Sequence, residues 1–202
     1  MSGYIARGMT TPTPISRGEF GIVGARRILP LLQAQKIPTT WFIPGFTIET
    51  YPEACTEVVQ GGHEIGHHGW THVQPALLDR AQEESEMIRA NDAIARLCGQ
   101  RAQGYRSPAW DLSPHTLELL IQHGFYYESS MMGHDYSPYR VRQGDVIELQ
   151  KPMLFGAAKT EPIHLILPNK ARKWMPMLVQ AAPLRLIITW DRSLTFQERQ
   201  PL

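Results

Sequence analysis

The chain has 202 residues, of which 43% are hydrophobic, and a formal net charge of +1 at pH 7. That length fits a single domain, and the near-neutral charge excludes a generally basic nucleic-acid or membrane-surface protein. Its two cysteines exclude a disulfide framework or a cysteine-rich zinc module, and no run approaches the roughly 20 apolar residues of a membrane span.

Charge and proline divide the chain into parts. Residues 1–150 carry 12 Lys+Arg and 16 Asp+Glu, whereas residues 151–202 carry 8 and 3 and are rich in proline. The polar N-terminus has no apolar signal-peptide core, so we expect a cytoplasmic protein. We expect an irregular arm over 1–15, a core over 16–156 and a divergent basic tail over 157–202.

Helices and strands are expected to alternate along the core. Helices are predicted over 21–35, from Thr50 (as N-cap) to the glycines at 61–62, over 76–97 and over 113–124. Between them, strands are predicted over 39–43, 63–67, 104–106 and 125–127. The acidic run Glu83, Glu84 and Glu86 is expected on the wet side of the third helix. This alternation predicts βαβ units and a parallel sheet, open or closed into a barrel.

Four of the eight histidines lie between His63 and His72. On an extended strand, His68 and His72 would lie about 13 Å apart, so they can share one ion only if the chain bends. Gly69 permits that bend, and two imidazoles at a strand end predict a catalytic metal site with an open position for water. His67 points away from His68 and is expected to support the site. A histidine pair at this spacing is more often unligated, so a histidine-rich α/β domain without metal is the alternative.

Several segments together resemble the polysaccharide deacetylase (NodB-homology) family. The run Gly62-His63-Glu64-Ile65-Gly66, followed by His68-Gly69-Trp70-Thr71-His72, resembles the histidine motif of that family. Residues 41–45 are similar to the strand before the motif, and 106–110 resemble its arginine-containing substrate-groove motif. Residues 16–21 and 129–133 resemble an allantoinase-like subgroup that hydrolyses small cyclic amides and imides. The resemblance spans about residues 16 to 156.

The resemblance implies both a fold and a set of roles. The fold is α/β, an incomplete or distorted (β/α) barrel of the NodB-homology type with an atypical C-terminal part. His68 and His72 would ligate a divalent metal, with zinc favoured and manganese as the alternative. Arg106 would orient a catalytic carboxylate, and Trp110 and Pro108 would line the substrate groove.

The chain also departs from the family pattern. The first strand of the family carries an aspartate motif that supplies a base and a metal ligand, but no Asp precedes Asp79 here, so that strand is expected to be missing. His164 matches poorly the late catalytic histidine. Glu19, in a predicted glycine-flanked turn, is our candidate for a substitute base, with Glu64 and Asp135 as the other carboxylates.

Three functions remain open at this stage. The first is a metal-assisted hydrolase of carbon–nitrogen bonds acting on a small amide or imide, and the second is an N-acetyl polysaccharide deacetylase. The third is a catalytically impaired homologue that keeps the fold and binds metal or a partner. A nucleotide-binding domain is disfavoured because no glycine-rich phosphate loop follows a strand. Self-association is expected because an incomplete barrel exposes sheet edges.

Overall fold

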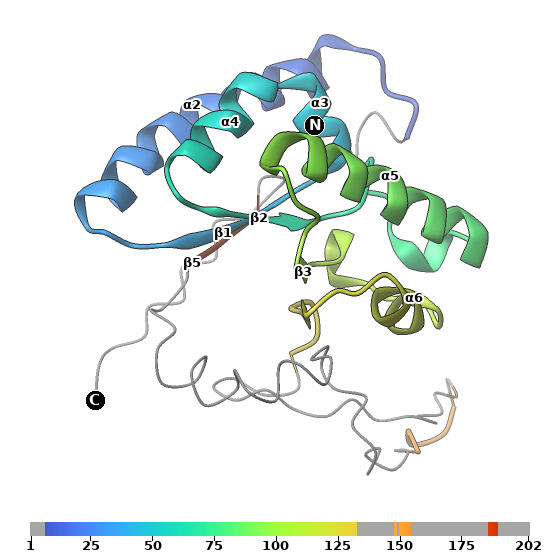
Figure 1. Ribbon diagram of the computed structural model, residues 1–202. Helices are drawn as coiled ribbons and strands as arrows, with labels where there is room; N and C mark the ends of the chain where they lie inside the picture. The colour runs from blue at the N-terminus through green and yellow to red at the C-terminus, as the bar shows by residue number, and fades with distance from the viewer. Residues whose placement is uncertain (1–6, 133–147, 149, 155–185, 190–202) are drawn as a thin grey trace, which may run out of the picture.

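The computed structural model describes residues 7–132, 148, 150–154 and 186–189. Its centre is a five-stranded, all-parallel sheet in the order β4-β3-β2-β1-β5, with α2, α4 and α5 packed over one side (Figure 1). The strands are β1 (Thr39–Ile43), β2 (Glu64–His67), β3 (Gly104–Tyr105), β4 (Tyr127–Glu128) and β5 (Leu186–Thr189). The helices are α2 (Pro12–Ala34), α3 (Gly45–Thr50), α4 (Pro52–Gln60), α5 (Arg80–Cys98) and α6 (Thr116–Gln122), with 3-10 turns at Pro75–Leu77 and Pro108–Trp110. The predicted parallel α/β architecture is confirmed.

Helix α2 begins earlier than expected. The predicted irregular arm is wrong from Pro12 onward, because α2 starts there and runs to Ala34. Proline is favoured in the first turn of a helix, where its missing N–H has no intrahelical partner to lose. The end of the helix agrees with the prediction.

The predicted N-cap at Thr50 is also wrong. Thr50 is the last residue of α3, and its hydroxyl donates a 2.6 Å hydrogen bond to the carbonyl of Phe46. Helix α4 starts at Pro52 instead, one residue after Tyr51, and ends before Gly61. The proline signal therefore located the helix, whereas the threonine belongs to the short helix before it.

Helix α5 has the best-defined ends. Its N-cap, Asp79, accepts a 2.8 Å hydrogen bond from the backbone N–H of Gln82, whose side chain accepts one from the backbone of Asp79 in a reciprocal capping box. Gly99, with φ of 74°, ends the helix in the left-handed conformation. These caps fix the helix that lies closest to the histidine segment.

The two faces of the sheet differ in composition. Residues Trp41, Ile43, Ile65 and Tyr105 belong to the hydrophobic core. On the alternate positions, the Phe42 ring lies against Gly66, and the Tyr127 ring contacts both Gly104 and Phe42. Side chains alternate between faces along a strand, so His68 and Arg106, which follow β2 and β3, continue the second face.

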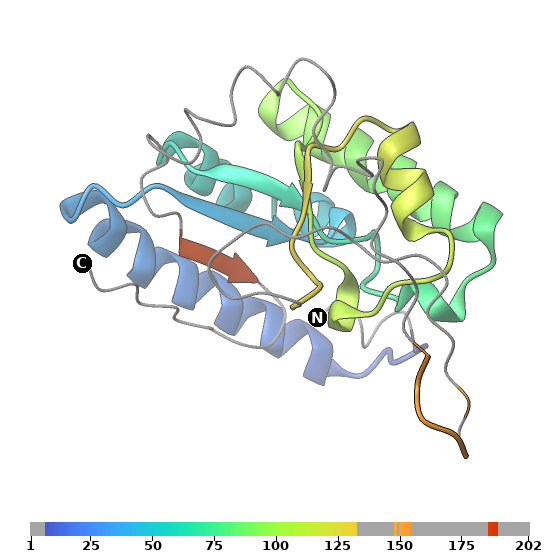
Figure 2. The same ribbon diagram turned by 90° about the horizontal axis from the view of Figure 1, so that it is seen from below.

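Strand β5 comes from the predicted tail. It pairs in parallel with β1, in the register Thr39 to Leu186 through Phe42 to Thr189. The sheet therefore crosses the predicted boundary at 156, and Figure 2 shows β5 beside β1 at the edge. The run Leu-Ile-Ile-Thr, in which the last three residues are β-branched, signals this strand in the sequence. Among the described residues, no helix combines the length and apolar character that crossing a membrane requires.

Candidate metal and catalytic site

The chain bends sharply after β2 and brings two imidazoles together. Gly69 has φ of 70° and His72 has φ of 64°, so both adopt the left-handed conformation. The ring centroids of His68 and His72 consequently lie 4.7 Å apart, with the ring planes at 73°. The predicted bend is confirmed, and these two side chains converge.

The ring of His68 is held in one orientation. Its Nδ1 lies 2.7 Å from the backbone carbonyl oxygen of Arg106, and because a carbonyl only accepts, Nδ1 carries the proton. The side chain is buried, and burial together with the neighbouring His72 lowers its pKa to about 3. His68 is therefore a neutral imidazole whose Nε2 is the nitrogen left to act as a lone-pair donor.

His67 supports the bend from the opposite face of the sheet. Its Nδ1 accepts a 3.2 Å hydrogen bond from the N–H of Gly69, and its Nε2 donates a 3.0 Å bond to the carbonyl of Met87 in α5. Its ring lies against Tyr105 and Phe125, and burial lowers its pKa to about 4. His67 therefore ties the bend at Gly69 to α5.

Arg106 is buried beside the histidine pair. Its Nε donates to the hydroxyl of Ser129 at 3.0 Å and its Nη2 to the carbonyl of Ser129 at 3.2 Å. The guanidinium lies 5.2 Å from the Phe42 ring and 5.9 Å from the Trp110 ring, measured from Cζ to each centroid. Burial lowers the pKa of Arg106, while the charge of Glu128 opposes that shift. The guanidinium held by Ser129 is therefore a fixed positive charge.

The segment after Arg106 is strained and carries the predicted groove residues. Ala109 has φ of 56° and Trp110 has φ of 58°, both unfavourable for residues with a Cβ. Pro108 is buried against Gly69, whereas the indole of Trp110 remains 40% exposed. The structure thus places Arg106, Pro108 and Trp110 on the chain segment that also anchors His68.

The predicted base at Glu19 is not brought to this site. The expected turn is wrong, because Glu19 lies within α2, where its side chain is exposed. Burial and then the charge of Glu19 raise the pKa of Tyr51. Glu64 accepts hydrogen bonds from the hydroxyls of Thr40 (2.7 Å) and Tyr127 (2.9 Å). Asp135 and His164 lie outside the described residues.

The imidazole pair matches part of a metal site. Neutral imidazoles with one nitrogen fixed by a backbone carbonyl are typical ligands of zinc and similar cations. Catalytic zinc usually has three protein ligands, and within residues 7–132, 148, 150–154 and 186–189 no cluster of three or more His, Cys, Asp or Glu side chains is suited to a metal. Among the described residues, the convergent pair His68 and His72 therefore remains a candidate pair of ligands, without a third group beside it in a cluster of three.

Sequence reasoning missed the groups that hold these side chains. The carbonyl of Arg106 and the hydroxyl of Ser129 carry no distinctive sequence signal, since any residue has a carbonyl and serines are common. Glu128, whose carboxylate accepts from the backbone N–H groups of Ser130 and Met131, fixes the loop that binds Arg106. A glutamate directly after the predicted strand over 125–127 was the available signal for that loop.

Comparison with known sequences agrees with the family resemblance of the sequence motifs. Residues 23–127 match the family model described as polysaccharide deacetylase. The chain is 43% identical over 139 residues to a peptidoglycan deacetylase of Helicobacter pylori, covering 68% of this chain and 47% of that protein. It is 33% identical over 162 residues to the peptidoglycan deacetylase-like protein FGM2 of Gibberella zeae, covering 75% and 47%. The chain spans about half the length of these relatives.

Solved structures extend the similarity to the fold. A polysaccharide deacetylase-type structure from Mycobacterium smegmatis aligns with a TM-score of 0.61 and 28% identity, covering 92% of this chain and 68% of that one. The structure of Puue allantoinase aligns with a TM-score of 0.53 and 31% identity, covering 58% and 39%. The first alignment takes in most of the chain.

Proposed function

The chain belongs to the polysaccharide deacetylase family, and on that premise we propose that it is a metal-assisted hydrolase of non-peptide carbon–nitrogen bonds. His68 and His72 would hold the divalent cation, zinc or alternatively manganese. The observation that carries the proposal is the 4.7 Å approach of the two rings, with Nδ1 of His68 anchored and its Nε2 left for a ligand bond. A cation held there supplies Lewis-acid polarisation of an amide carbonyl and makes a water molecule more acidic.

The remaining residues bind and orient the substrate. Arg106 provides a fixed positive charge for a carboxylate or for the oxygen of a polarised carbonyl. Trp110 offers an exposed ring face, and buried Pro108 backs the bend at Gly69. Trp110 and Pro108 are therefore our candidates for lining a substrate groove beside the histidine pair.

Two substrate classes fit the proposal. A small cyclic amide or imide is favoured by the resemblance of residues 16–21 and 129–133 to allantoinase-like proteins and by the structural similarity to Puue allantoinase. An N-acetylated glycan is the second candidate, favoured by the 43% identity to a peptidoglycan deacetylase. Both reactions break an amide-type bond at a polarised carbonyl, so the same site serves either.

No general base is assigned among the residues that the structure describes. Glu19 is exposed on α2, Glu64 accepts hydrogen bonds from the hydroxyls of Thr40 and Tyr127, and the aspartate motif of the family is absent before Asp79. We therefore propose that hydrolysis by this chain alone is weak, and that a catalytically impaired homologue that still binds metal is the second candidate function. General base catalysis typically accelerates a reaction about 10²- to 10⁴-fold, so we expect the rate of hydrolysis to be reduced by a factor of that size.

One experiment tests the metal and the activity together. Zinc and manganese content and affinity are measured for the chain and for His68→Ala and His72→Ala, alongside hydrolysis of succinimide, allantoin and an N-acetylglucosamine oligomer. Metal binding that both substitutions abolish supports the ligand assignment, and unchanged metal content in both variants contradicts it. Turnover of succinimide or allantoin would identify a cyclic amide or imide bond as the target, and turnover of the N-acetylglucosamine oligomer would identify an N-acetyl bond. Robust turnover would show that a base is present after all.

We also propose that the protein is cytoplasmic and self-associates, with no nucleic-acid or membrane partner. Strands β4 and β5 are the outer strands of the described sheet, and outer strands favour pairing with another chain. Light scattering coupled to size-exclusion chromatography tests the oligomeric state directly. A monomer at micromolar concentration contradicts self-association.

A further inference from the structure

A carboxylate on α5 fixes the loop between the two histidines. The Oε2 atom of Glu86 accepts hydrogen bonds from the backbone N–H groups of Trp70 and Thr71, each at 3.2 Å, and lies 3.5 Å from the hydroxyl of Thr71. Hydrogen bonds to an ionised acceptor are stronger than those between neutral groups. One oxygen atom thus accepts hydrogen bonds from the two backbone N–H groups directly before His72.

Other contacts hold the same loop from both sides. The carbonyls of Gly69 and Trp70 each accept a 3.0 Å hydrogen bond, from the N–H groups of Gly45 and Phe46 respectively. The guanidinium of Arg89, one turn along α5 from Glu86, lies 3.9 Å from the Trp70 ring centroid. The loop is therefore clamped between the start of α3 and one face of α5.

The loop conformation that these contacts stabilise is unfavourable in isolation. His72 has φ of 64°, a left-handed conformation that a side chain with a Cβ rarely adopts. It persists only where surrounding contacts over-determine it. The hydrogen bonds at residues 70 and 71 hold the backbone directly before His72, so their loss would allow its ring to shift relative to that of His68.

We infer that Glu86 is a positioning residue of the metal site, one that holds His72 where it can share a cation with His68. This inference rests on the proposed function. The hydrogen bonds of Glu86 reach the backbone of residues 70 and 71 and the hydroxyl of Thr71, so its effect on His72 passes through the loop. Substituting a residue that orients a metal ligand typically lowers the metal affinity 10- to 100-fold.

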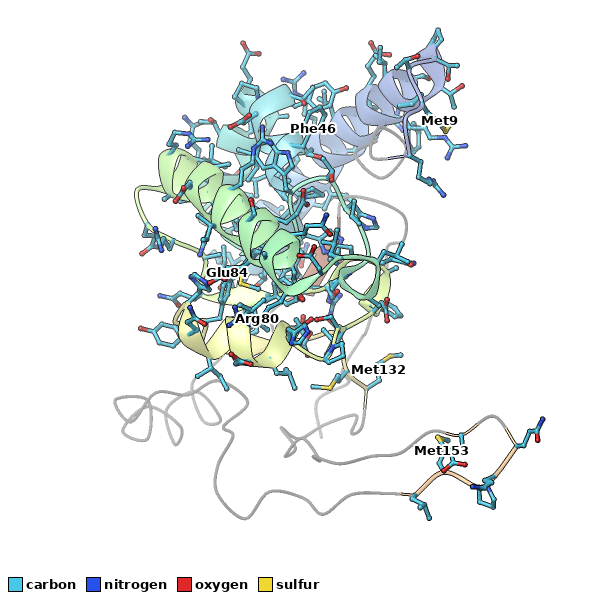
Figure 3. All side chains as sticks on the ribbon, turned by 90° about the vertical axis from the view of Figure 1, so that its right-hand side faces the viewer. Met9, Phe46, Arg80, Glu84, Met132 and Met153 are labelled. Atoms are coloured by element: carbon cyan, nitrogen blue, oxygen red, sulfur yellow. The ribbon has the colours of Figure 1, made fainter. Side chains whose placement is uncertain are left out.

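The test compares two carboxylates on the same helix. Glu86→Ala removes the acceptor, and Glu86→Gln keeps one oxygen that can accept both N–H groups. Glu84→Ala is the matched control, because Glu84 pairs with Arg80 and with His123, directly after α6, instead of the loop. Figure 3 shows Arg80 and Glu84. In the full chain, we expect zinc affinity to fall 10- to 100-fold in Glu86→Ala, less than threefold in Glu86→Gln and less than twofold in Glu84→Ala.

A second readout separates positioning from stability and from activity. The absorption spectrum of bound Co²⁺ reports ligand geometry, and ring-to-ring NOEs between His68 and His72 report their approach in the metal-free protein. We expect Glu86→Ala to change the Co²⁺ absorption spectrum and to lose the NOEs between the two rings. Glu86→Gln should show the wild-type spectrum and the wild-type NOEs. Wild-type affinity, spectrum and NOEs in Glu86→Ala would overturn the inference.

The two proposals can fail separately. If His68→Ala and His72→Ala keep the metal, the proposed function fails, and the NOEs of the metal-free Glu86→Ala variant still decide the positioning role. If those variants lose the metal while Glu86→Ala does not, the function stands and the inference fails. Should Glu86→Ala not fold, Glu86→Asp keeps the charge but shortens the side chain, and the same loss of affinity is expected.

Discussion

The imidazole of His68 donates its Nδ1 proton to the backbone carbonyl of Arg106 across 2.7 Å. This single bond joins the end of β2 to the end of β3, two strands that are neighbours in the sheet. It fixes the tautomer and the orientation of the ring at once. The segment that carries the arginine therefore also determines which nitrogen of the histidine is available to a metal.

The two adjacent histidines are predicted to be in opposite tautomers. His68 carries its proton on Nδ1, whereas His67 accepts from Gly69 at Nδ1 and donates from Nε2 to Met87. Long-range ¹H–¹⁵N correlation spectra of the metal-free protein near pH 7 measure this directly. We expect one protonated Nδ1 and one protonated Nε2. The same tautomer at both residues would contradict the hydrogen bonding described here.

Glycine at position 104 is predicted to be essential for packing. A Cβ added there would collide with the Tyr127 ring, which lies across the strand and hydrogen-bonds Glu64. Gly104→Ala must displace that ring, so we expect the free energy of unfolding to fall by about 1–3 kcal/mol in urea denaturation.

Gly24→Ala is the matched control for this substitution. Gly24 lies inside α2, and a Cβ there meets nothing within 4 Å. Alanine is the better helix former, so this variant should gain up to about 1 kcal/mol. Equal effects of the two substitutions would mean that the Tyr127 ring does not occupy the space at Gly104.

Local signals explain which elements the sequence could predict. The run Thr39–Ile43 forms the predicted strand, and α5 ends beside Gly99 as its glycine signal indicated. The bend at Gly69 was also predictable, since it needs only one permissive residue between His68 and His72. Each of these depends on neighbours in the chain, so periodicity and turn chemistry are enough.

The acidic run on α5 shows where such reasoning stops. Glu83, Glu84 and Glu86 were expected on the wet side, yet Glu83 is 3% exposed and accepts hydrogen bonds from the hydroxyls of Ser113 and Thr116. Glu86 is half-buried and accepts hydrogen bonds from the backbone of Trp70 and Thr71. Their donors lie 15 to 33 residues away along the chain, and no helical pattern reports partners at that separation.

Backbone strain at Ala109 gives a further prediction. Because φ there is 56°, replacing the methyl group with hydrogen relieves an unfavourable conformation, and we expect Ala109→Gly to stabilise the fold by about 0.5–1 kcal/mol. The control Ala95→Gly, within α5, should destabilise by about 1 kcal/mol. Thermal unfolding measures both. Destabilisation by Ala109→Gly would show that the methyl group contributes packing that outweighs the strain.

The buried histidines predict a loss of stability in acid. The pKa of His67 is lowered to about 4 in the folded protein, whereas an unfolded histidine titrates near 6.5, so between these values the unfolded state binds more protons. The contribution of His67 is present in full above pH 6.5 and is lost as pH falls toward 4, with a loss on the order of 3 kcal/mol. His68, with a pKa of about 3, adds a parallel loss. Urea denaturation with EDTA at pH 7, 5.5 and 4.5 measures the slope, and His67→Asn, which keeps an acceptor for Gly69, should flatten it. A variant with the wild-type slope would assign the acid sensitivity to other groups.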